Sequence, residues 1–122
     1  MPKVIYDTIR GLIQEGGSGI ETTAGPLQLH SYEMHDNVTE TLNKTTIFHL
    51  ADPANGAATL TLPANPPMGM VKVIIVIDNS NNTVIKSTNT TLGGDLTFTQ
   101  IGDGAIAFGL GASGWCLLRS NS

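Results

Sequence analysis

From residue 27 onward, apolar and polar side chains mostly alternate along the chain, which is the pattern of β-strands with one buried face. In one such run, Leu60 and Leu62 alternate with Thr59 and Thr61. Segments rich in Gly, Asn and Pro separate these runs and are typical of turns. The pattern predicts strands over Leu27–Tyr32, Thr45–Leu50, Ala58–Leu62, Met70–Ile77, Asn82–Ser87, Asp95–Gln100, Ala105–Leu110 and Trp115–Arg119.

The run from Met70 to Ile77 departs from simple alternation, because it is apolar on both faces apart from Lys72. Such a run is expected where a strand is covered on both sides. It therefore predicts a central strand, buried on both faces or on one face against a partner chain. The residues that we assign to this buried or shared strand are Val71, Val73, Ile75 and Ile77.

The N-terminal residues follow a different period. Apolar residues recur there at helical spacing before the run Gly16-Gly17-Ser18-Gly19, which predicts a short amphipathic helix followed by a flexible linker. We interpret residues 1–21 as an arm with its linker and residues 22–122 as the β domain. The arm either folds back on the domain or contacts another subunit or a larger assembly, through Val4, Ile5, Ile9, Leu12 and Ile13.

The spacing of the predicted strands indicates an all-β fold, an antiparallel β-sandwich or jelly roll of about eight short strands. The composition agrees, with 15 Thr, 14 Gly and 9 Asn in 122 residues. Aromatic residues make up only 5% of the chain, so the core is expected to be mostly aliphatic. The single cysteine, Cys116, cannot form an internal disulfide, and its apolar neighbours favour a buried thiol.

Charge and hydropathy argue against several classes of partner. The net charge is −4 and the six Lys and Arg residues are scattered, so the clustered basic surface of a nucleic-acid-binding protein is missing. No apolar run approaches the ~20 residues of a membrane-spanning helix. The N-terminus has no signal-peptide pattern. We therefore expect synthesis in a reducing cytoplasm, with no direct contact to nucleic acid or membrane.

The residues that could carry chemistry form no recognisable motif. His30 and His35 are five positions apart and would face opposite sides of one strand, while His49 lies in another strand. Glu33 or Asp36 could add a carboxylate, but no spacing of two histidines with a carboxylate favours a metal site. The G-x-S-x-G nucleophile pattern is absent. The sequence thus predicts no catalytic residue, no metal site and no cofactor.

Several short motifs between about residue 45 and residue 121 nevertheless form a distinctive series. They are Thr59-Leu60-Thr61-Leu62-Pro63, Met68-Gly69 before the apolar strand, a Thr- and Asn-rich hairpin, Gly102-Asp103-Gly104-Ala105, and Gly114-Trp115-Cys116-Leu117-Leu118. The series resembles small β-structured surface proteins of tailed bacteriophages, namely capsid decoration (cement) proteins and the terminal domains of tail fibres. The resemblance covers roughly two-thirds of the chain.

This resemblance implies a homotrimer with a structural role on the virion, because both groups are commonly trimeric. The short arm favours a decoration protein over a fibre. The partners expected on this basis are further copies of the chain and the major capsid protein. The apolar residues of the arm would then contact the capsid shell, and the strand from Val71 to Ile77 would be shared around the threefold axis.

Two alternatives remain open at this stage. A tail-fibre tip that binds host glycans would need exposed aromatic side chains, and Tyr32 and Trp115 are the obvious candidates. We expect Trp115 in the core instead, with its indole N–H bonded to a backbone carbonyl. An enzyme or another kind of β domain would need a pocket in which histidines and carboxylates converge.

Overall fold

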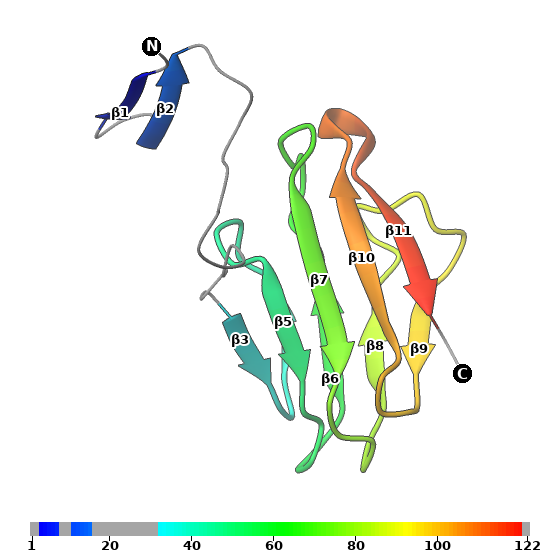
Figure 1. Cartoon of the computed structure of the whole chain (residues 1–122). Helices are drawn as coiled ribbons and strands as arrows, with labels where there is room; N and C mark the ends of the chain where they lie inside the picture. Colours follow the sequence, from blue (N-terminus) through cyan, green and yellow to red (C-terminus); the bar gives the residue numbers. More distant parts are fainter. Residues whose placement is uncertain (1–2, 8–10, 16–31, 121–122) are drawn as a thin grey trace.

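The computed structural model describes residues 3–7, 11–15 and 32–120 of the chain and is dominated by β-strands (Figure 1). One short 3-10 helix, η1 (Gly111–Ser113), precedes the last strand. The strands are β1 (Lys3–Asp7), β2 (Gly11–Glu15), β3 (Tyr32–His35), β4 (Thr39–Thr41), β5 (Phe48–Ala51), β6 (Ala58–Thr61), β7 (Val71–Val76), β8 (Thr83–Ile85), β9 (Leu96–Phe98), β10 (Gly104–Gly109) and β11 (Trp115–Ser120). The expected all-β class is confirmed.

From β3 to β8 the chain alternates between two sheets, placing one strand in each sheet in turn. As a result, β3, β5 and β7 are parallel neighbours in a five-stranded sheet of order β11-β10-β7-β5-β3. Likewise β4, β6 and β8 are parallel neighbours in a four-stranded sheet of order β4-β6-β8-β9. The last three strands pair antiparallel, β9 with β8, β10 with β7, and β11 with β10.

The antiparallel arrangement expected from the sequence is therefore wrong, because both sheets are mixed. Parallel neighbours need a crossover connection, and here the crossover is a strand of the opposite sheet. The polar turn after β7 illustrates this, since it leads to β8 of the other sheet rather than back along β7. In that turn the Ser80 backbone N–H donates to the Asp78 carboxylate at 2.7 Å. A jelly-roll order is not confirmed.

The core lies between the two sheets, which form the front and back layers in Figure 1. Alternate residues of each strand point into it, as in β7, where Ile74 and Val76 are buried. The other fully buried side chains are mostly small or branched aliphatic residues, together with one phenylalanine: Ala51, Leu60, Leu62, Ile85, Phe98 and Ala107. The core is thus mostly aliphatic, as the composition predicts.

The seven strands predicted from Thr45 onward are confirmed, with ends that shift by at most three residues. The predicted strand Leu27–Tyr32 lies outside the described residues except for Tyr32, which begins β3. The sequence pattern missed β4, because all three of its residues are polar and exposed. Among the described residues, no helix has the length and hydropathy needed to span a membrane.

The helix predicted for the N-terminal arm is wrong. Residues 3–7 and 11–15 form an antiparallel hairpin whose register pairs Ile5 with Ile13 and Tyr6 with Leu12. The β-branched residues of the segment favour strands, and Gly11 is unfavourable inside a helix, so local propensity overrides the helical spacing. Of the five arm residues, Val4 and Ile5 lie in β1 and Leu12 and Ile13 in β2, whereas Ile9 lies outside the described residues.

Candidate functional site

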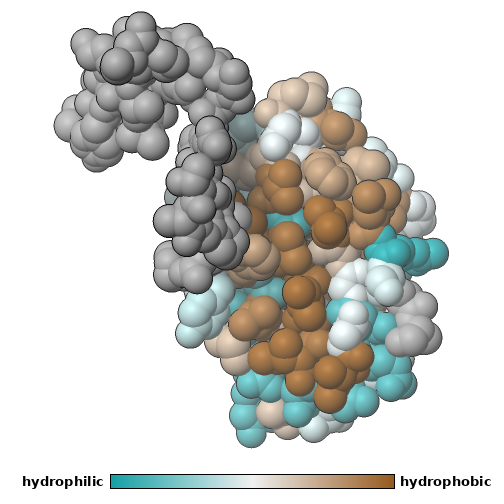
Figure 2. All heavy atoms as spheres, viewed as in Figure 1, coloured by the Kyte–Doolittle hydropathy of each residue, from teal (hydrophilic) through white to brown (hydrophobic). Residues whose placement is uncertain are grey.

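The outer face of the five-stranded sheet is apolar along all five strands. Along each strand the outward residues alternate with residues that point into the core. The pairing of the strands places the outward residues side by side across the sheet, for example Phe48 beside Val73 and Ile106 beside Leu118. The outward residues are Tyr32, Met34, Phe48, Leu50, Val71, Val73, Ile75, Gly104, Ile106, Phe108, Cys116, Leu118 and Ser120. None of them carries a charge. We call this set the apolar face, and Figure 2 shows its hydrophobic atoms gathered over the middle of the molecule.

Of the four residues predicted for the central strand, Val71, Val73 and Ile75 lie on the outer side of β7, whereas Ile77 follows the end of that strand. Val71 and Val73 are half-buried, while Ile75 and Ile77 are 37% and 40% exposed. The core-facing side of β7 consists instead of Lys72, Ile74 and Val76. The strand is central in its sheet, as predicted, but it is buried on one side only. Burial of both sides within the chain is therefore wrong, and burial of the outer side against a partner chain stays a prediction.

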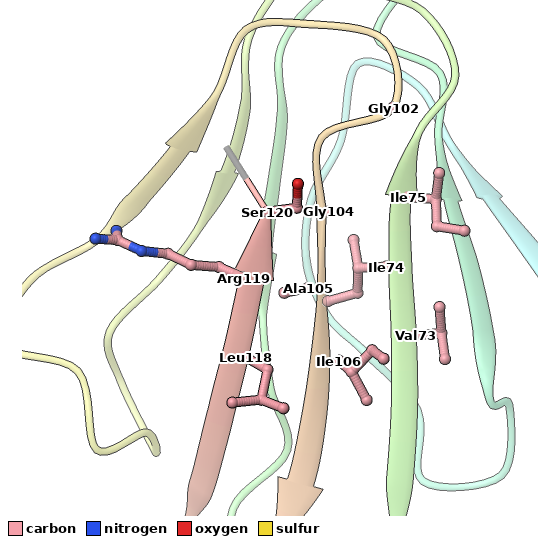
Figure 3. Close-up of a pocket in the computed structure, with 10 residues that line it drawn as sticks. All are labelled: Val73, Ile74, Ile75, Gly102, Gly104, Ala105, Ile106, Leu118, Arg119 and Ser120. Carbon is pink, nitrogen blue, oxygen red and sulfur yellow. The ribbon is translucent and has the colours of Figure 1, made fainter. Parts of the chain in front are cut away.

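A shallow depression lies within the apolar face where β7, β10 and β11 run side by side (Figure 3). Gly104 is one of its lining residues, and no side chain fits at this position, because a Cβ there would lie 2.4 Å from the Ile74 carbonyl oxygen. Ile75, Ile106 and Leu118 form its apolar rim. Arg119 is near the same depression, but its guanidinium extends away from these side chains.

The outer face of the four-stranded sheet has the opposite character. Its outward positions in β4 and β6 are threonines, with Thr39 beside Thr59 and Thr41 beside Thr61 in parallel register. Large exposed hydrophobic side chains are absent from the described strands of this sheet. The two sides of the molecule therefore differ sharply in what they present to solvent.

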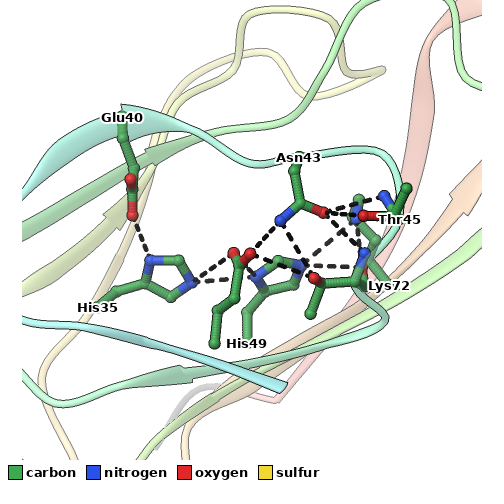
Figure 4. A network of polar contacts seen from close by, with 8 residues as sticks. His35, Glu40, Asn43, Thr45, His49 and Lys72 are labelled. Carbon is green, nitrogen blue, oxygen red and sulfur yellow. Dashed lines mark hydrogen bonds and ion pairs between the residues drawn. The ribbon is translucent and has the colours of Figure 1, made fainter. Parts of the chain in front are cut away.

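A cluster of polar side chains lies between the two sheets at the β3 and β4 edge (Figure 4). His35 of β3 and His49 of β5 are 1% and 0% exposed, and Lys72 of β7 is also fully buried. Parallel register places His49 directly beside Glu33 of β3, and Glu33 and His35 point to the same side because they are two residues apart. Glu40 reaches the cluster from β4 of the other sheet.

The groups of this cluster converge on a small volume. The Nε2 of His35 lies 3.0 Å from the Nδ1 of His49. The Oε2 of Glu33 lies 4.0 Å from the first of these nitrogens and 3.7 Å from the second. These three atoms, all within 4.8 Å of one another, are the group among the described residues that could hold a metal ion.

Each of these three side chains has a further partner. The carboxylate of Glu40 accepts from Nδ1 of His35, and the carbonyl oxygen of Thr46 lies 3.1 Å from Nε2 of His49. The Oε1 of Glu33 accepts from the side-chain amide of Asn43 and from the Thr46 hydroxyl. The ring orientations and the carboxylate plane are thereby fixed.

Burial changes the protonation of two cluster members. Burial, with smaller contributions from the charges of Lys72 and His35, lowers the pKa of His49 to about 4. The ring is therefore neutral at pH 7. Burial also lowers the pKa of Lys72, against the opposing effect of the Glu33 carboxylate, and its Nζ donates to the Thr46 carbonyl.

This cluster was not predicted, because the spacing of histidines along one strand does not reveal histidines that meet from two different strands. His30 lies outside the described residues, and Asp36 binds the Asn55 side chain and backbone instead of joining the cluster. One feature of the sequence does point to the cluster. Glu33 and His35 are two residues apart, so both lie on the same face of a strand. The partner strand of that pair, and hence His49, could not be read from the sequence.

The predicted role of Trp115 is confirmed. Its side chain is 0% exposed, and its indole N–H donates to the Pro63 carbonyl at 2.7 Å. It is therefore not available as a sugar-stacking platform, whereas Tyr32 is 63% exposed on the edge strand β3. Cys116 is a free thiol and is half-buried on the apolar face rather than in the core.

A comparison with protein-family models finds no match for this chain, and neither does a comparison with curated proteins.

Proposed function

We propose that this chain is a structural virion protein of the capsid decoration type, which assembles as a homotrimer and stabilises a phage head. The observation that carries the proposal is the apolar face on one side of an otherwise polar body. Its role is mechanical and involves no catalysis. The residues that we assign to the subunit contact are Val71, Val73, Ile75 and Ile77, with their neighbours on β10 and β11.

The size of the apolar face favours its permanent burial against another protein surface. Five strands of four to six residues cover on the order of 400 Å² at the usual strand spacing and rise. This matches the largest apolar patch of a typical monomer, about 300–600 Å², and such patches are often binding sites. A second copy of the chain is the occupant that fits best, because the face carries no charge that a polar or ionic partner could neutralise.

A threefold arrangement uses such a flat face efficiently. Three sheets that face a common axis form a triangular prism, in which each apolar face contacts both neighbours. Residues of the middle strand β7, such as Val73 and Ile75, would then lie closest to the axis. Stable interfaces bury about 800 Å² per partner, roughly twice the area of the face. The face therefore needs additional contacts.

The N-terminal hairpin supplies a segment for a contact with a second partner. We assign Val4, Ile5, Ile9, Leu12 and Ile13 to binding of the major capsid protein, so that the body is held on the shell surface. A trimer with three such arms contacts several shell subunits at once. Binding across their junctions adds buried area and opposes the outward pressure of packaged DNA.

The buried histidine cluster does not redirect this proposal toward an enzyme. A catalytic site needs a cavity for substrate next to its acid and base groups. The depression on the apolar face and a second one beside Met68 and Met70 contain neither Glu33 nor the two histidines. The cluster is better explained as part of the framework of the fold.

The proposal is tested by sedimentation of the full chain with empty head shells of the phage that encodes it. The wild-type chain is expected to pellet with the shells at a fixed ratio. Ile13→Asp, in the hairpin, should abolish pelleting, because it places a charge in the shell contact. Thr41→Asp, on the threonine-lined side, serves as the control and should pellet normally.

Failure of the wild-type chain to pellet with the shells would refute the decoration role. Equal pelleting of Ile13→Asp and the wild-type chain would show that the hairpin does not make the shell contact. Circular dichroism of each variant establishes beforehand that the β body is intact.

A further inference from the structure

We propose that the buried cluster is a structural site for a divalent transition-metal ion, Zn²⁺ foremost, bound by Oε2 of Glu33, Nε2 of His35 and Nδ1 of His49. This site would join the edge strand β3 to β5 on the inner face of the five-stranded sheet. It is independent of the proposed virion role, since it does not involve the apolar face or the N-terminal hairpin.

The hydrogen-bond partners of the two imidazoles assign their protons. Nδ1 of His35 faces the Glu40 carboxylate, which only accepts, so this nitrogen carries a proton. Nε2 of His49 faces the Thr46 carbonyl oxygen at 3.1 Å, which is closer than the Lys72 Nζ at 3.4 Å. Because the carbonyl oxygen is the nearer of the two groups and can only accept, we assign the proton of His49 to Nε2.

A ring that carries one proton has its lone pair on the other nitrogen. The two remaining nitrogens, Nε2 of His35 and Nδ1 of His49, face each other at 3.0 Å. Two lone pairs at this distance repel each other unless a cation lies between or beside them. Either an additional proton or a metal ion satisfies this requirement, and the nearby carboxylate favours the metal ion.

The distances among the three proposed ligand atoms also suit a zinc ion. Zinc binds histidine nitrogen and carboxylate oxygen at about 2.0–2.2 Å, so tetrahedral ligand atoms lie about 3.3 Å from one another. The three separations here are 3.0, 3.7 and 4.0 Å. Each ligand atom therefore needs to move by only a few tenths of an ångström to bind one common ion.

Every proposed ligand also has a second partner that orients it. Metal-binding histidines usually donate their other ring N–H to a carboxylate or a backbone carbonyl, and ligating carboxylates are themselves hydrogen-bonded. Glu40 and the Thr46 carbonyl play this role for His35 and His49. Asn43 and the Thr46 hydroxyl hold Oε1 of Glu33, which leaves Oε2 directed at the two rings.

Charge and access are also compatible with a metal ion. The carboxylates of Glu33 and Glu40 outweigh the single ammonium of Lys72, which lies on the Nε2 side of His49, away from the ligand nitrogen. The Glu33 side chain is 38% exposed, so the site opens to solvent beside it. A water molecule entering there would complete a fourth position, as in sites with two histidines and one glutamate.

The test is equilibrium dialysis of the untagged full chain against ZnCl₂ at micromolar free Zn²⁺, with the bound metal measured by mass spectrometry. The wild-type chain is expected to bind one Zn²⁺ and to melt at a higher temperature when Zn²⁺ is present. Glu33→Gln should weaken binding at least tenfold, because it removes a charged ligand. Glu40→Gln should weaken it by about 10- to 100-fold, because it removes the partner that orients His35.

Asp95→Asn removes a carboxylate just before β9, outside the cluster, and serves as the control, with an affinity within twofold of the wild-type value. Replacement of Zn²⁺ by Co²⁺ should give the visible absorption of tetrahedral cobalt in the wild-type chain. The same absorption should be strongly reduced in Glu33→Gln, whose fold is checked by circular dichroism.

Two results would overturn the site. Lack of stoichiometric Zn²⁺ binding by the wild-type chain would mean that a proton, and not a metal ion, lies between the two imidazoles. Binding of equal strength by the wild-type chain and a folded Glu33→Gln variant would place the metal elsewhere.

Discussion

At the scale of single residues, Trp115 shows how one side chain can hold the two layers together. It is fully buried at the start of β11, and its indole N–H is bonded to the carbonyl oxygen of Pro63, which follows β6 in the other sheet. The backbone beside it is also bound, because its own N–H donates to the Asn89 carbonyl at 2.8 Å. The ring therefore combines apolar packing with a satisfied polar group.

Trp115→Phe keeps an aromatic ring but leaves the Pro63 carbonyl without its donor. A buried group left unsatisfied costs about 1–3 kcal/mol, so the free energy of unfolding should fall by at least that amount. Urea denaturation measures the change. Tyr32→Phe, at an exposed position, is the control and should change stability by less than about 0.5 kcal/mol. Equal midpoints for the wild-type chain and Trp115→Phe would show that this hydrogen bond is not important.

A second residue-scale prediction concerns Asp95, just before β9. The Lys86 ammonium and the Ser87 backbone N–H both bind its carboxylate and lower its pKa to about 2, from an ordinary value of 3.8. The charged form is favoured in the folded state. The contribution of Asp95 to stability is therefore complete above pH 3.8 and is lost as the pH falls toward 2.

The stability difference between the wild-type chain and Asp95→Asn should accordingly shrink as the pH is lowered through this range. Thermal melts at several pH values measure the difference, and an NMR titration of the carboxyl carbon gives the pKa directly. A titration midpoint at the ordinary aspartate value would contradict the assignment of these hydrogen bonds.

At the scale of elements, strand β7 has two different sides, one that packs in the core and one that belongs to the apolar face. Ile74 is 0% exposed, and its neighbour Ile75 is 37% exposed on the other side. An uncompensated charge in the core costs several kcal/mol, which is a large part of the stability of a small domain. Substitutions at these two adjacent positions therefore distinguish folding from association.

Ile74→Asp is expected to unfold the domain. Ile75→Asp is expected to keep the wild-type circular dichroism spectrum, because its carboxylate reaches solvent in the isolated chain, but to lose self-association. Circular dichroism and sizing chromatography measure the two effects. A folded Ile74→Asp variant, or an Ile75→Asp variant that still associates, would contradict the division of β7 into these two sides.

The strands themselves could be predicted because the alternation of residues such as Leu60 and Thr61 follows directly from the geometry of a strand. Their pairing could not, since alternation is the same in parallel and antiparallel sheets. The helix predicted at the N-terminus failed because Ile5, Ile9 and Ile13 match helical spacing, yet β-branched residues favour strands. The histidine cluster depends on the parallel register of β3 with β5, which the sequence does not reveal.

At the scale of the whole molecule, the two layers present different surfaces. The four-stranded sheet exposes threonines, and the five-stranded sheet exposes an uncharged apolar face. The polar cluster lies between them at one edge, with Glu40 of one sheet bound to His35 of the other. This asymmetry is what the proposed assembly requires, because one side associates with further copies while the other side remains in water.

The molar mass of the full chain in solution, from light scattering on a sizing column, tests the central claim most directly. The account predicts a trimer, with three times the chain mass of 12.8 kDa, and predicts that Ile75→Asp reduces this mass to that of the single chain. A wild-type mass of 12.8 kDa would contradict burial of the apolar face between copies of the chain. A mass of twice that value would contradict the threefold arrangement.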